Sequence, residues 1–269
     1  MKIIQKFTTD NPCFYGDEYI TPKGLMLHSV GCPQPDGQVW SNVYNKDVGA
    51  CVHAFIDANN GTIYQTLPWN HRGWHCAGSG NDTHIGVEMA ESQYITYTGG
   101  ANFTCSNPAA AKKQAQTAYN AAVELFAHIC KQYKLDPLKQ ICSHAEGSKK
   151  GIASNHADPE HYWDQLGTGY TMDGFRKAVK AKMGSSAASQ LPAKTETKTA
   201  ANTFLIRVRI PDLNIRSGAG TNYPSKGFIQ PSIYTIVETK TAGGYTWGRL
   251  KSGAGWIALE YTTRVESRK

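Results

Sequence analysis

The stretch that decides the fold of the amino-terminal part is GLMLHSV, residues 24–30. Its short, continuous apolar run is typical of a strand that is buried in a sheet. IGVEMA at residues 85–90 is a second such run, and residues 141–144 resume a strand. Between them lies one long helical pattern, Pro108–Tyr133, which has a proline near its start and apolar residues spaced by three and four. The alternation predicts an α/β domain.

Further elements fit the same class of fold. Residues 52–56 and 62–66 read as a hairpin, with Asn59, Asn60 and Gly61 as its turn. Residues 159–166 and 173–183 are predicted as closing helices. We find no internal repeat.

A change in amino-acid composition divides the chain. SSAASQLPAKTETKTAAN, residues 185–202, is small and polar and has no aromatic residue, so it is predicted to be a flexible linker. Two domains follow from it, residues 1–184 and residues 203–269. The second is predicted to be a small all-β barrel, because short runs alternate with Gly, Pro and Asn. Those runs are residues 204–208, 214–216, 234–239, 247–250 and 255–258.

Charge is unevenly distributed along the 269 residues, whose net charge is +7. Residues 1–184 hold 16 basic and 16 acidic side chains, whereas residues 203–269 hold 10 and 4. The second domain is therefore expected to meet an anionic partner. No DNA or RNA recognition motif accompanies this charge, which argues against nucleic acid. No run approaches the ~18 apolar residues of a membrane span. The amino terminus lacks the apolar run of a signal peptide, so we expect synthesis in the cytoplasm.

Histidine and carboxylate residues near strand ends form the first candidate site. His28 and His144 are both placed at the end of a strand, and strand ends open onto the ligand-binding crevice of an α/β sheet. The two side chains can converge there if their strands are neighbours. His156 and Asp158 follow on a probable loop. Two imidazoles and one carboxylate match a catalytic zinc site with an open position, where zinc would activate a water molecule. The alternative is a set of ordinary histidines that are hydrogen-bonded at loop ends.

Glu88 is the candidate general base. It lies among apolar neighbours in HIGVEMAE, where a carboxylate is costly without a partner or a function. Strand alternation places it on one face with Gly86 and Ala90, whose small size leaves space before it. Burial would raise its pKa into a range suited to proton transfer. A salt-bridged structural role remains the alternative.

These motifs resemble the zinc-dependent N-acetylmuramoyl-L-alanine amidases of type 2, which share a fold with peptidoglycan recognition proteins and phage lysins. The resemblance covers roughly residues 20–183 and rests on LMLHSVG, VHAFIDANNGTIYQTLP, RGWHCAGSGNDTHIGVEMAES and the CSHAEG…ASNHADPEHYW segment. It implies a central mixed sheet flanked by helices. It also implies that His28, His144 and Asp158 bind zinc and that Glu88 is the catalytic glutamate.

Further roles follow from the same resemblance. His156 falls where many members have an oxyanion-stabilising lysine. The spacing also allows the alternative that His156 is the third zinc ligand and that Asp158 supports it without contacting the metal. His53, Trp74, His75 and Asn81 lie in segments that form the substrate cleft of similar proteins; packing in the core is the alternative for each.

The seven cysteines are odd in number, include no CxxC pair and all precede residue 184. We therefore predict buried reduced thiols and no oxidised framework. Cys32 and Cys142 fall nearest to the predicted zinc site. A thiolate ligand is possible there, but the resemblance assigns neither residue a role.

The second domain resembles bacterial SH3-type wall-binding domains, through LNIRSGAGTNY and WGRLKSGAGWIALEYTTRV. Its charge suits an anionic Gram-positive cell wall. The alternative is that the basic residues only keep a small barrel soluble. The resemblance implies a peptidoglycan hydrolase, and the missing signal peptide fits a phage or prophage endolysin released through a holin-made hole or at lysis. A non-catalytic recognition protein and a zinc peptidase that cuts within the stem peptide are the alternatives.

Overall fold

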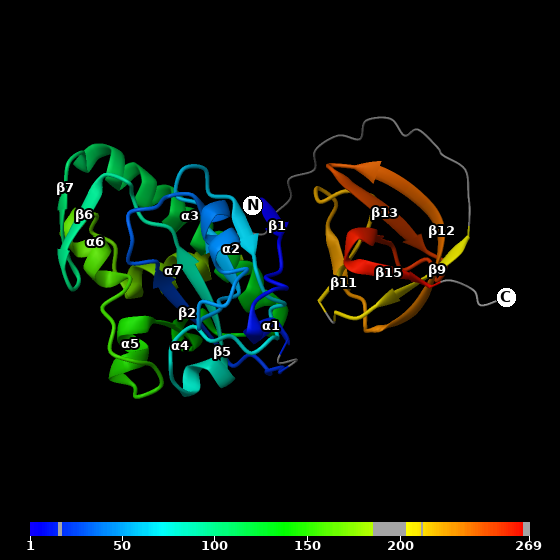
Figure 1. The fold of residues 1–269 in the computed structure, drawn as a ribbon, viewed down its shortest axis with the longest axis horizontal. Helices are drawn as coiled ribbons and strands as arrows, with labels where there is room; N and C mark the ends of the chain where they lie inside the picture. The colour runs from blue at the N-terminus through cyan, green and yellow to red at the C-terminus, as the bar shows by residue number, and fades with distance from the viewer. Residues whose placement is uncertain (16–17, 185–202, 211, 266–269) are drawn as a thin grey trace. The chain divides into compact units, whose positions relative to one another are not determined.

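The structure, a computed structural model, describes residues 1–15, 18–184, 203–210 and 212–265 (Figure 1). The chain divides into two compact units, Met1–Ala188 and Ser189–Lys269, which are described separately below. The predicted linker, residues 185–202, lies outside the described residues.

The first unit is built on a six-stranded mixed sheet in the order β1-β4-β3-β5-β2-β8. Its strands are β1 (Ile3–Gln5), β2 (Gly24–Ser29), β3 (Ala54–Ile56), β4 (Ile63–Gln65), β5 (His84–Met89) and β8 (Ile141–Ser143). The β3–β4 pair is antiparallel, as the hairpin prediction requires, and the other pairs are parallel. Every residue of β2 is buried, which explains the continuous run GLMLHS.

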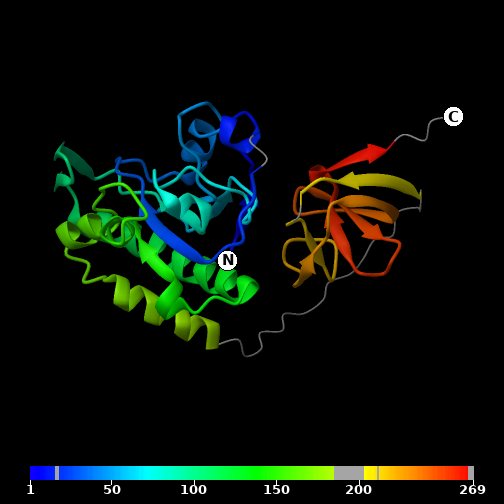
Figure 2. The same ribbon diagram turned by 90° about the horizontal axis from the view of Figure 1, so that it is seen from below.

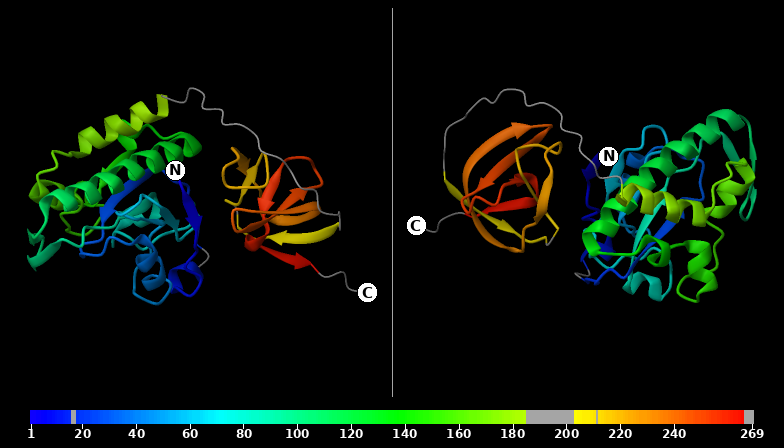
Figure 3. Two further views of the ribbon diagram at one scale, coloured as in Figure 1. Left: turned by 90° about the horizontal axis from the view of Figure 1, so that it is seen from above. Right: turned by 180° about the vertical axis from the view of Figure 1, so that it is seen from behind.

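Helices cover both faces of this sheet (Figures 2 and 3). They are α1 (Pro12–Tyr15), α2 (Gly37–Val43), α3 (Pro108–Tyr133), α4 (Pro137–Gln140), α5 (His144–Lys149), α6 (Glu160–Leu166), α7 (Met172–Gly184) and the 3-10 helix η1 (Ser79–Asp82). In these views α3 and α7 lie on one side of the sheet, and α1 and α2 lie on the other. The predicted α/β class is confirmed.

The long helix α3 has the predicted bounds because its end signals are local. The Asn107 side chain accepts a hydrogen bond from the Ala110 N–H, Pro108 occupies the first turn, and Lys134 ends the helix in the left-handed conformation. Its buried stripe includes Leu125, Phe126 and Ile129, which belong to the main hydrophobic core with residues of β2 and β5.

A two-stranded hairpin stands apart from the main sheet. It consists of β6 (Ile95–Gly99) and β7 (Asn102–Cys105), and Figure 1 shows it at one edge of the first unit. The sequence analysis predicted no element here, because exposed Thr and Asn residues interrupt the apolar pattern.

The second unit is an antiparallel seven-stranded sheet in the order β11-β10-β14-β13-β12-β9-β15. Its elements are β9 (Phe204–Val208), β10 (Asn214–Arg216), β11 (Ser225–Phe228), β12 (Ser232–Ala242), β13 (Tyr245–Leu250), β14 (Trp256–Ala258), the 3-10 helix η2 (Leu259–Tyr261) and β15 (Thr262–Val265). An apolar core that includes Ile206, Ile236 and Ile257 fills it. The all-β prediction is confirmed, and the sheet is consistent with an SH3-like domain; β11 and β15 were not predicted.

The prediction of reduced cysteines is wrong at one pair, because Cys13 and Cys51 form a disulfide. It joins α1 to the segment before β3, within a small apolar cluster that also contains Leu67. The odd cysteine count concealed the pair, because only the fold brings residues 38 positions apart together. The other five cysteines are free thiols: Cys32, Cys76, Cys105, Cys130 and Cys142.

Candidate active site

Three predicted metal ligands from three separate segments converge. His28 Nδ1 lies 3.1 Å from His144 Nδ1 and 3.3 Å from Asp158 Oδ2, and His144 Nδ1 lies 3.5 Å from Asp158 Oδ1. All three side chains are buried. We call this group the His–His–Asp cluster. The nitrogen and carboxylate atoms that it offers lie within 4.8 Å of one another, a spacing that one metal ion can bridge.

The sequence holds these ligands in place through neighbouring elements. His28 belongs to β2, which pairs with β8. His144 was predicted to end that strand, but β8 stops at Ser143 and His144 is instead the first residue of α5. The reason is a capping box: the Ser143 hydroxyl and the Glu146 carboxylate bond each other's backbone N–H and start the helix. Arg176 in turn holds Glu146 through two hydrogen bonds, of 2.7 and 2.9 Å.

The protonation states suit metal binding. Burial, together with the charge of His28, lowers the pKa of His144 to about 4, so this imidazole is neutral at pH 7. Burial opposes the ionisation of Asp158, but the neighbouring imidazoles of His28 and His144 lower its pKa overall. A metal ion needs a free imidazole nitrogen and an ionised carboxylate, and both are present here.

Glu88 lies beside the cluster, on the strand next to His28. The two residues are direct partners in the parallel β2–β5 pair. Glu88 is half-buried, and its Oε2 is buried without a hydrogen-bond partner. Burial first, and then the negative charges of Asp158 and Glu91, raise its pKa well above the usual value. An unpartnered carboxyl group with a raised pKa is what general-base chemistry requires.

A cavity of about 740 Å³ joins these groups. Its lining includes seven of the nine predicted site residues: Trp74, His75, Asn81, Glu88, His144, His156 and Asp158. His28 and His53 are fully buried and do not belong to that lining. The cavity therefore brings the candidate base and two members of the His–His–Asp cluster to one surface.

His156 is exposed at this surface and is not part of the cluster. Its Nδ1 lies 2.9 Å from the Ser154 hydroxyl, which in turn lies 3.2 Å from His144 Nε2. The imidazole rings of His144 and His156 have centroids 4.3 Å apart. Of the two candidates for the third ligand, Asp158 is the one that the structure groups with His28 and His144.

Two of the predicted cleft residues use their polar atoms within the protein. The Gly86 N–H donates to His53 Nδ1, and His53 Nε2 lies 2.8 Å from the His71 carbonyl. His53 is thus buried and links two backbone segments. Its side chain does not line the cavity, where a substrate would bind. Asn81 Oδ1 accepts hydrogen bonds from the backbone N–H groups of His75 and Cys76, so it shapes the cavity wall.

The free thiols near the cluster show no sign of a ligand role. Cys142 packs with Met26 and Cys76, and burial raises its pKa to about 12. Burial also raises the pKa of Cys32. Both shifts disfavour the thiolate form that a metal needs.

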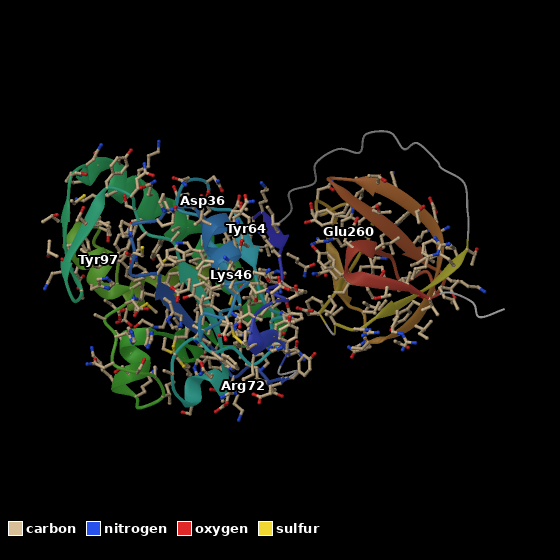
Figure 4. All side chains as sticks on the ribbon, viewed as in Figure 1. Asp36, Lys46, Tyr64, Arg72, Tyr97 and Glu260 are labelled. Carbon is tan, nitrogen blue, oxygen red and sulfur yellow. A yellow bond between two sulfur atoms is a disulfide. The ribbon has the colours of Figure 1, made fainter. Side chains whose placement is uncertain are left out.

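The sequence analysis missed a polar group on the hairpin side of the cavity. Tyr97 of β6, labelled in Figure 4, and His161 of α6 both line the cavity. The Tyr97 hydroxyl lies 2.7 Å from Glu91 Oε2 and 2.8 Å from His161 Nε2. Glu91 is fully buried, and burial raises its pKa to about 7. The signal for Glu91 was present in the sequence, since it follows Glu88 by three residues at the end of an apolar strand.

The His–His–Asp cluster, which could hold a metal ion, thus lies beside a carboxyl group with one unpartnered oxygen on a mixed α/β sheet. The family model for N-acetylmuramoyl-L-alanine amidases matches residues 18–161, more than half of the chain. The chain therefore belongs to this family and is an amidase that acts on peptidoglycan.

A solved structure supports the fold. The Staphylococcus aureus hydrolase AmiA, in complex with its ligand, is 22% identical; the match covers 68% of this chain and 83% of AmiA, with a TM-score of 0.51. PlyL (21% identity, 66% and 97% coverage, TM-score 0.47) and the PlyG catalytic domain (18%, 71% and 100%, TM-score 0.47) are further matches. No curated protein sequence matches the chain.

Proposed function

We propose that the chain is a zinc-dependent endolysin that cleaves the amide bond between N-acetylmuramic acid and the L-alanine of the stem peptide. The observation that carries this proposal is the His–His–Asp cluster, which lies next to Glu88 in the wall of a large cavity. The family membership supplies the substrate class.

The residues present fit a zinc ion. Zinc binds imidazole nitrogen and carboxylate oxygen at about 2.0–2.2 Å, and ligand atoms 3.1 to 3.5 Å apart agree with such bonds in a tetrahedral arrangement. His28, His144 and Asp158 would hold the ion and leave one position open toward the cavity. Bound there, zinc would lower the pKa of a water molecule and polarise the scissile carbonyl group.

Glu88 is proposed as the general base. Its unpartnered Oε2 would accept the proton of the attacking water, and its raised pKa would keep that proton available for the leaving amine. His156 is proposed to stabilise the oxyanion, because its exposed ring lies against His144 at the cavity surface.

Trp74, Asn81 and Tyr97 line the same cavity and are proposed to contact the glycan or the peptide. Trp74 offers an aromatic face for a sugar ring. The Tyr97 hydroxyl is held by Glu91 and His161, so it is positioned before substrate arrives.

We further propose three parts for the chain: a catalytic domain (residues 1–184), a linker (185–202) and an SH3-like wall-binding domain (203–269). Exposed Arg207, Arg209 and Lys251 of the second unit exemplify its basic surface. Such a surface suits anionic wall polymers and would keep the enzyme near its substrate. No helix of the described residues is long and apolar enough to cross a bilayer. The proposed place of action is the bacterial wall, after release from the cell that makes it.

Digestion of purified Gram-positive peptidoglycan tests the proposal. New L-alanine amino termini without new reducing sugar ends are expected. New amino termini on other residues would identify a peptidase on the same scaffold. Wall binding without any product would identify a recognition protein instead.

A further inference from the structure

We propose that His75 is a positioning residue for His28, and that it fixes the tautomer of His28 so that the Nδ1 lone pair faces the metal position. Sequence reasoning placed His75 in the substrate cleft. The inference rests on the proposed zinc amidase function and adds a residue to it that does not itself bind the metal.

The direction of the hydrogen bonds follows from one group that cannot donate. His75 Nε2 lies 3.0 Å from the backbone carbonyl of His84, and a carbonyl only accepts, so Nε2 carries the proton. A neutral imidazole has one N–H, so His75 Nδ1 is an acceptor. His28 Nε2 lies 3.0 Å from that atom and must therefore donate to it.

The consequence falls on the other nitrogen of His28. With its proton on Nε2, neutral His28 carries a lone pair on Nδ1, the atom that faces His144 Nδ1 and Asp158 Oδ2. The opposite tautomer would place an N–H where a metal ion needs a ligand. The other ring nitrogen of a ligating histidine generally fixes its tautomer and orientation by such a bond.

A second, independent observation concerns the space around the His75 ring. The ring lies directly against Gly86 of β5, where an added Cβ would be 2.4 Å from its Cγ and 2.6 Å from its Nδ1. On Gly73, an added Cβ would be 3.0 Å from its Cδ2. The absence of a side chain at Gly86 and Gly73 thus leaves the space that the His75 ring occupies, which we call its seat. The His28 and His75 rings meet edge to face at 81°.

Both nitrogens of His75 are therefore engaged within the protein, although the ring borders the cavity. Neither is left to bind substrate through a hydrogen bond. The effect of His75 is expected on zinc affinity, through His28.

Zinc affinity of the full-length chain, measured by competition with a chelator, tests this role. His75→Ala should weaken zinc binding about 10- to 100-fold. His75→Gln should restore most of it, because the amide N–H can donate to the His84 carbonyl while the amide oxygen accepts from His28 Nε2.

A second variant tests the seat without removing a histidine. Gly86→Ala should displace the His75 ring and weaken zinc binding in the same way. Gly174→Ala on α7 is the matched control, since the nearest atom to its new Cβ is the Thr171 hydroxyl at 3.2 Å. Thermal unfolding of each variant separates loss of fold from loss of affinity, and Gly86→Ala and the Gln rescue decide the matter if His75→Ala does not fold.

The ¹⁵N spectrum of the metal-free wild-type protein gives a readout that a merely structural role would not move. His28 should show a protonated Nε2 and a bare Nδ1, and His75→Ala should lose this preference. Zinc binding at wild-type strength in both His75→Ala and Gly86→Ala, or a protonated Nδ1 on His28 in the wild type, would overturn the inference. A wild-type chain that binds no zinc would instead overturn the proposed function.

Discussion

The two units of the chain place their polar groups in opposite ways. The first unit buries several ionisable side chains and pairs them with backbone groups or with other side chains. They are His28, His53, His71, His144, Asp57, Asp158 and Glu91. In the described part of the second unit, Asp212 is the one charged side chain that is buried, and the core is aliphatic. Residues 203–269 contain 10 basic and 4 acidic residues, and no basic residue among those described is buried.

The two units differ in the free energy that burial of polar groups costs them. A buried polar group costs free energy unless it is paired, and the first unit retains several around one cavity. That arrangement is expected where pKa values must be shifted for chemistry. The second unit has a conventional apolar core, so its charges are free to meet a partner in solvent. We infer catalysis in the first unit and attachment in the second.

His28→Ala tests this division between the two units and has the largest expected effect. Without one ligand of the His–His–Asp cluster, we expect zinc binding to fall to background and turnover to drop by about 10³-fold or more. Binding to intact walls should not change, since the substitution lies outside the proposed wall-binding domain. Zinc content, release of L-alanine amino termini and wall pull-down are the measurements. His128→Ala on α3, outside the cavity lining, is the control; lysis at wild-type rate by zinc-free His28→Ala would remove the cluster from the mechanism.

Glu88→Gln separates metal binding from proton transfer within the first unit. The amide keeps the shape of the carboxyl group but cannot accept the proton, so we expect full zinc content and a loss of about 10²–10⁴-fold in turnover. Steady-state kinetics on soluble muropeptides, with zinc content measured in parallel, test this. Near-wild-type turnover would show that another group is the base.

Deleting the second unit tests the division of labour. Residues 1–184 should fold and cleave soluble muropeptides at the full-length rate, but should lose about 10²-fold in activity on intact walls because the local concentration effect is gone. Wall binding by the full chain should also weaken between low and about 0.5 M salt, since exposed charges are screened. An insoluble or inactive fragment would show that the predicted boundary at residue 184 is wrong.

Local signals made half of the elements of the first unit and most of those of the second predictable. In the first unit no prediction was made for β1, α1, α2, η1, β6, β7, α4 and α5. The α3 helix has its predicted bounds because its cap and its proline are adjacent in sequence, and β2 and β5 follow from unbroken apolar runs. The convergence of His28 with His144 depended on their strands being neighbours, and the β2–β8 pair meets that condition.

What the sequence could not show depends on distant contacts. The Cys13–Cys51 pair, the Glu91–Tyr97–His161 group and the hydrogen bond from His28 to His75 all join segments that only the fold brings together. Even the placement of His144 changed, because the capping box at Ser143 ends the strand one residue earlier than the apolar pattern indicated.

The smallest expected effect concerns the stability cost of a buried charge in the first unit. Burial raises the pKa of Glu91 to about 7, above its value of about 4.3 in an unfolded chain. The folded state therefore holds this proton more tightly. The stabilisation is fully present below about pH 4 and is lost as the pH rises through 7, by up to about 4 kcal/mol.

Glu91→Gln removes this titration. The free energy of unfolding of the variant minus that of the wild type should thus increase by about 2–3 kcal/mol between pH 5 and pH 8. Glu91 does not contribute to the raised pKa of Glu160, so that titration cancels in this difference. The pKa of Glu88 is raised first by burial and by the charge of Asp158, which both remain in the variant, and it loses only the smaller contribution of Glu91. Asp164→Asn, at an exposed position on α6, is the matched control and should show no such trend. Urea unfolding across this pH range is the measurement. A difference in unfolding free energy that stays constant with pH would mean that burial of the ionised Glu91 carboxylate costs little free energy. The first unit would then bury this charge at no greater cost than the second unit has for its exposed charges.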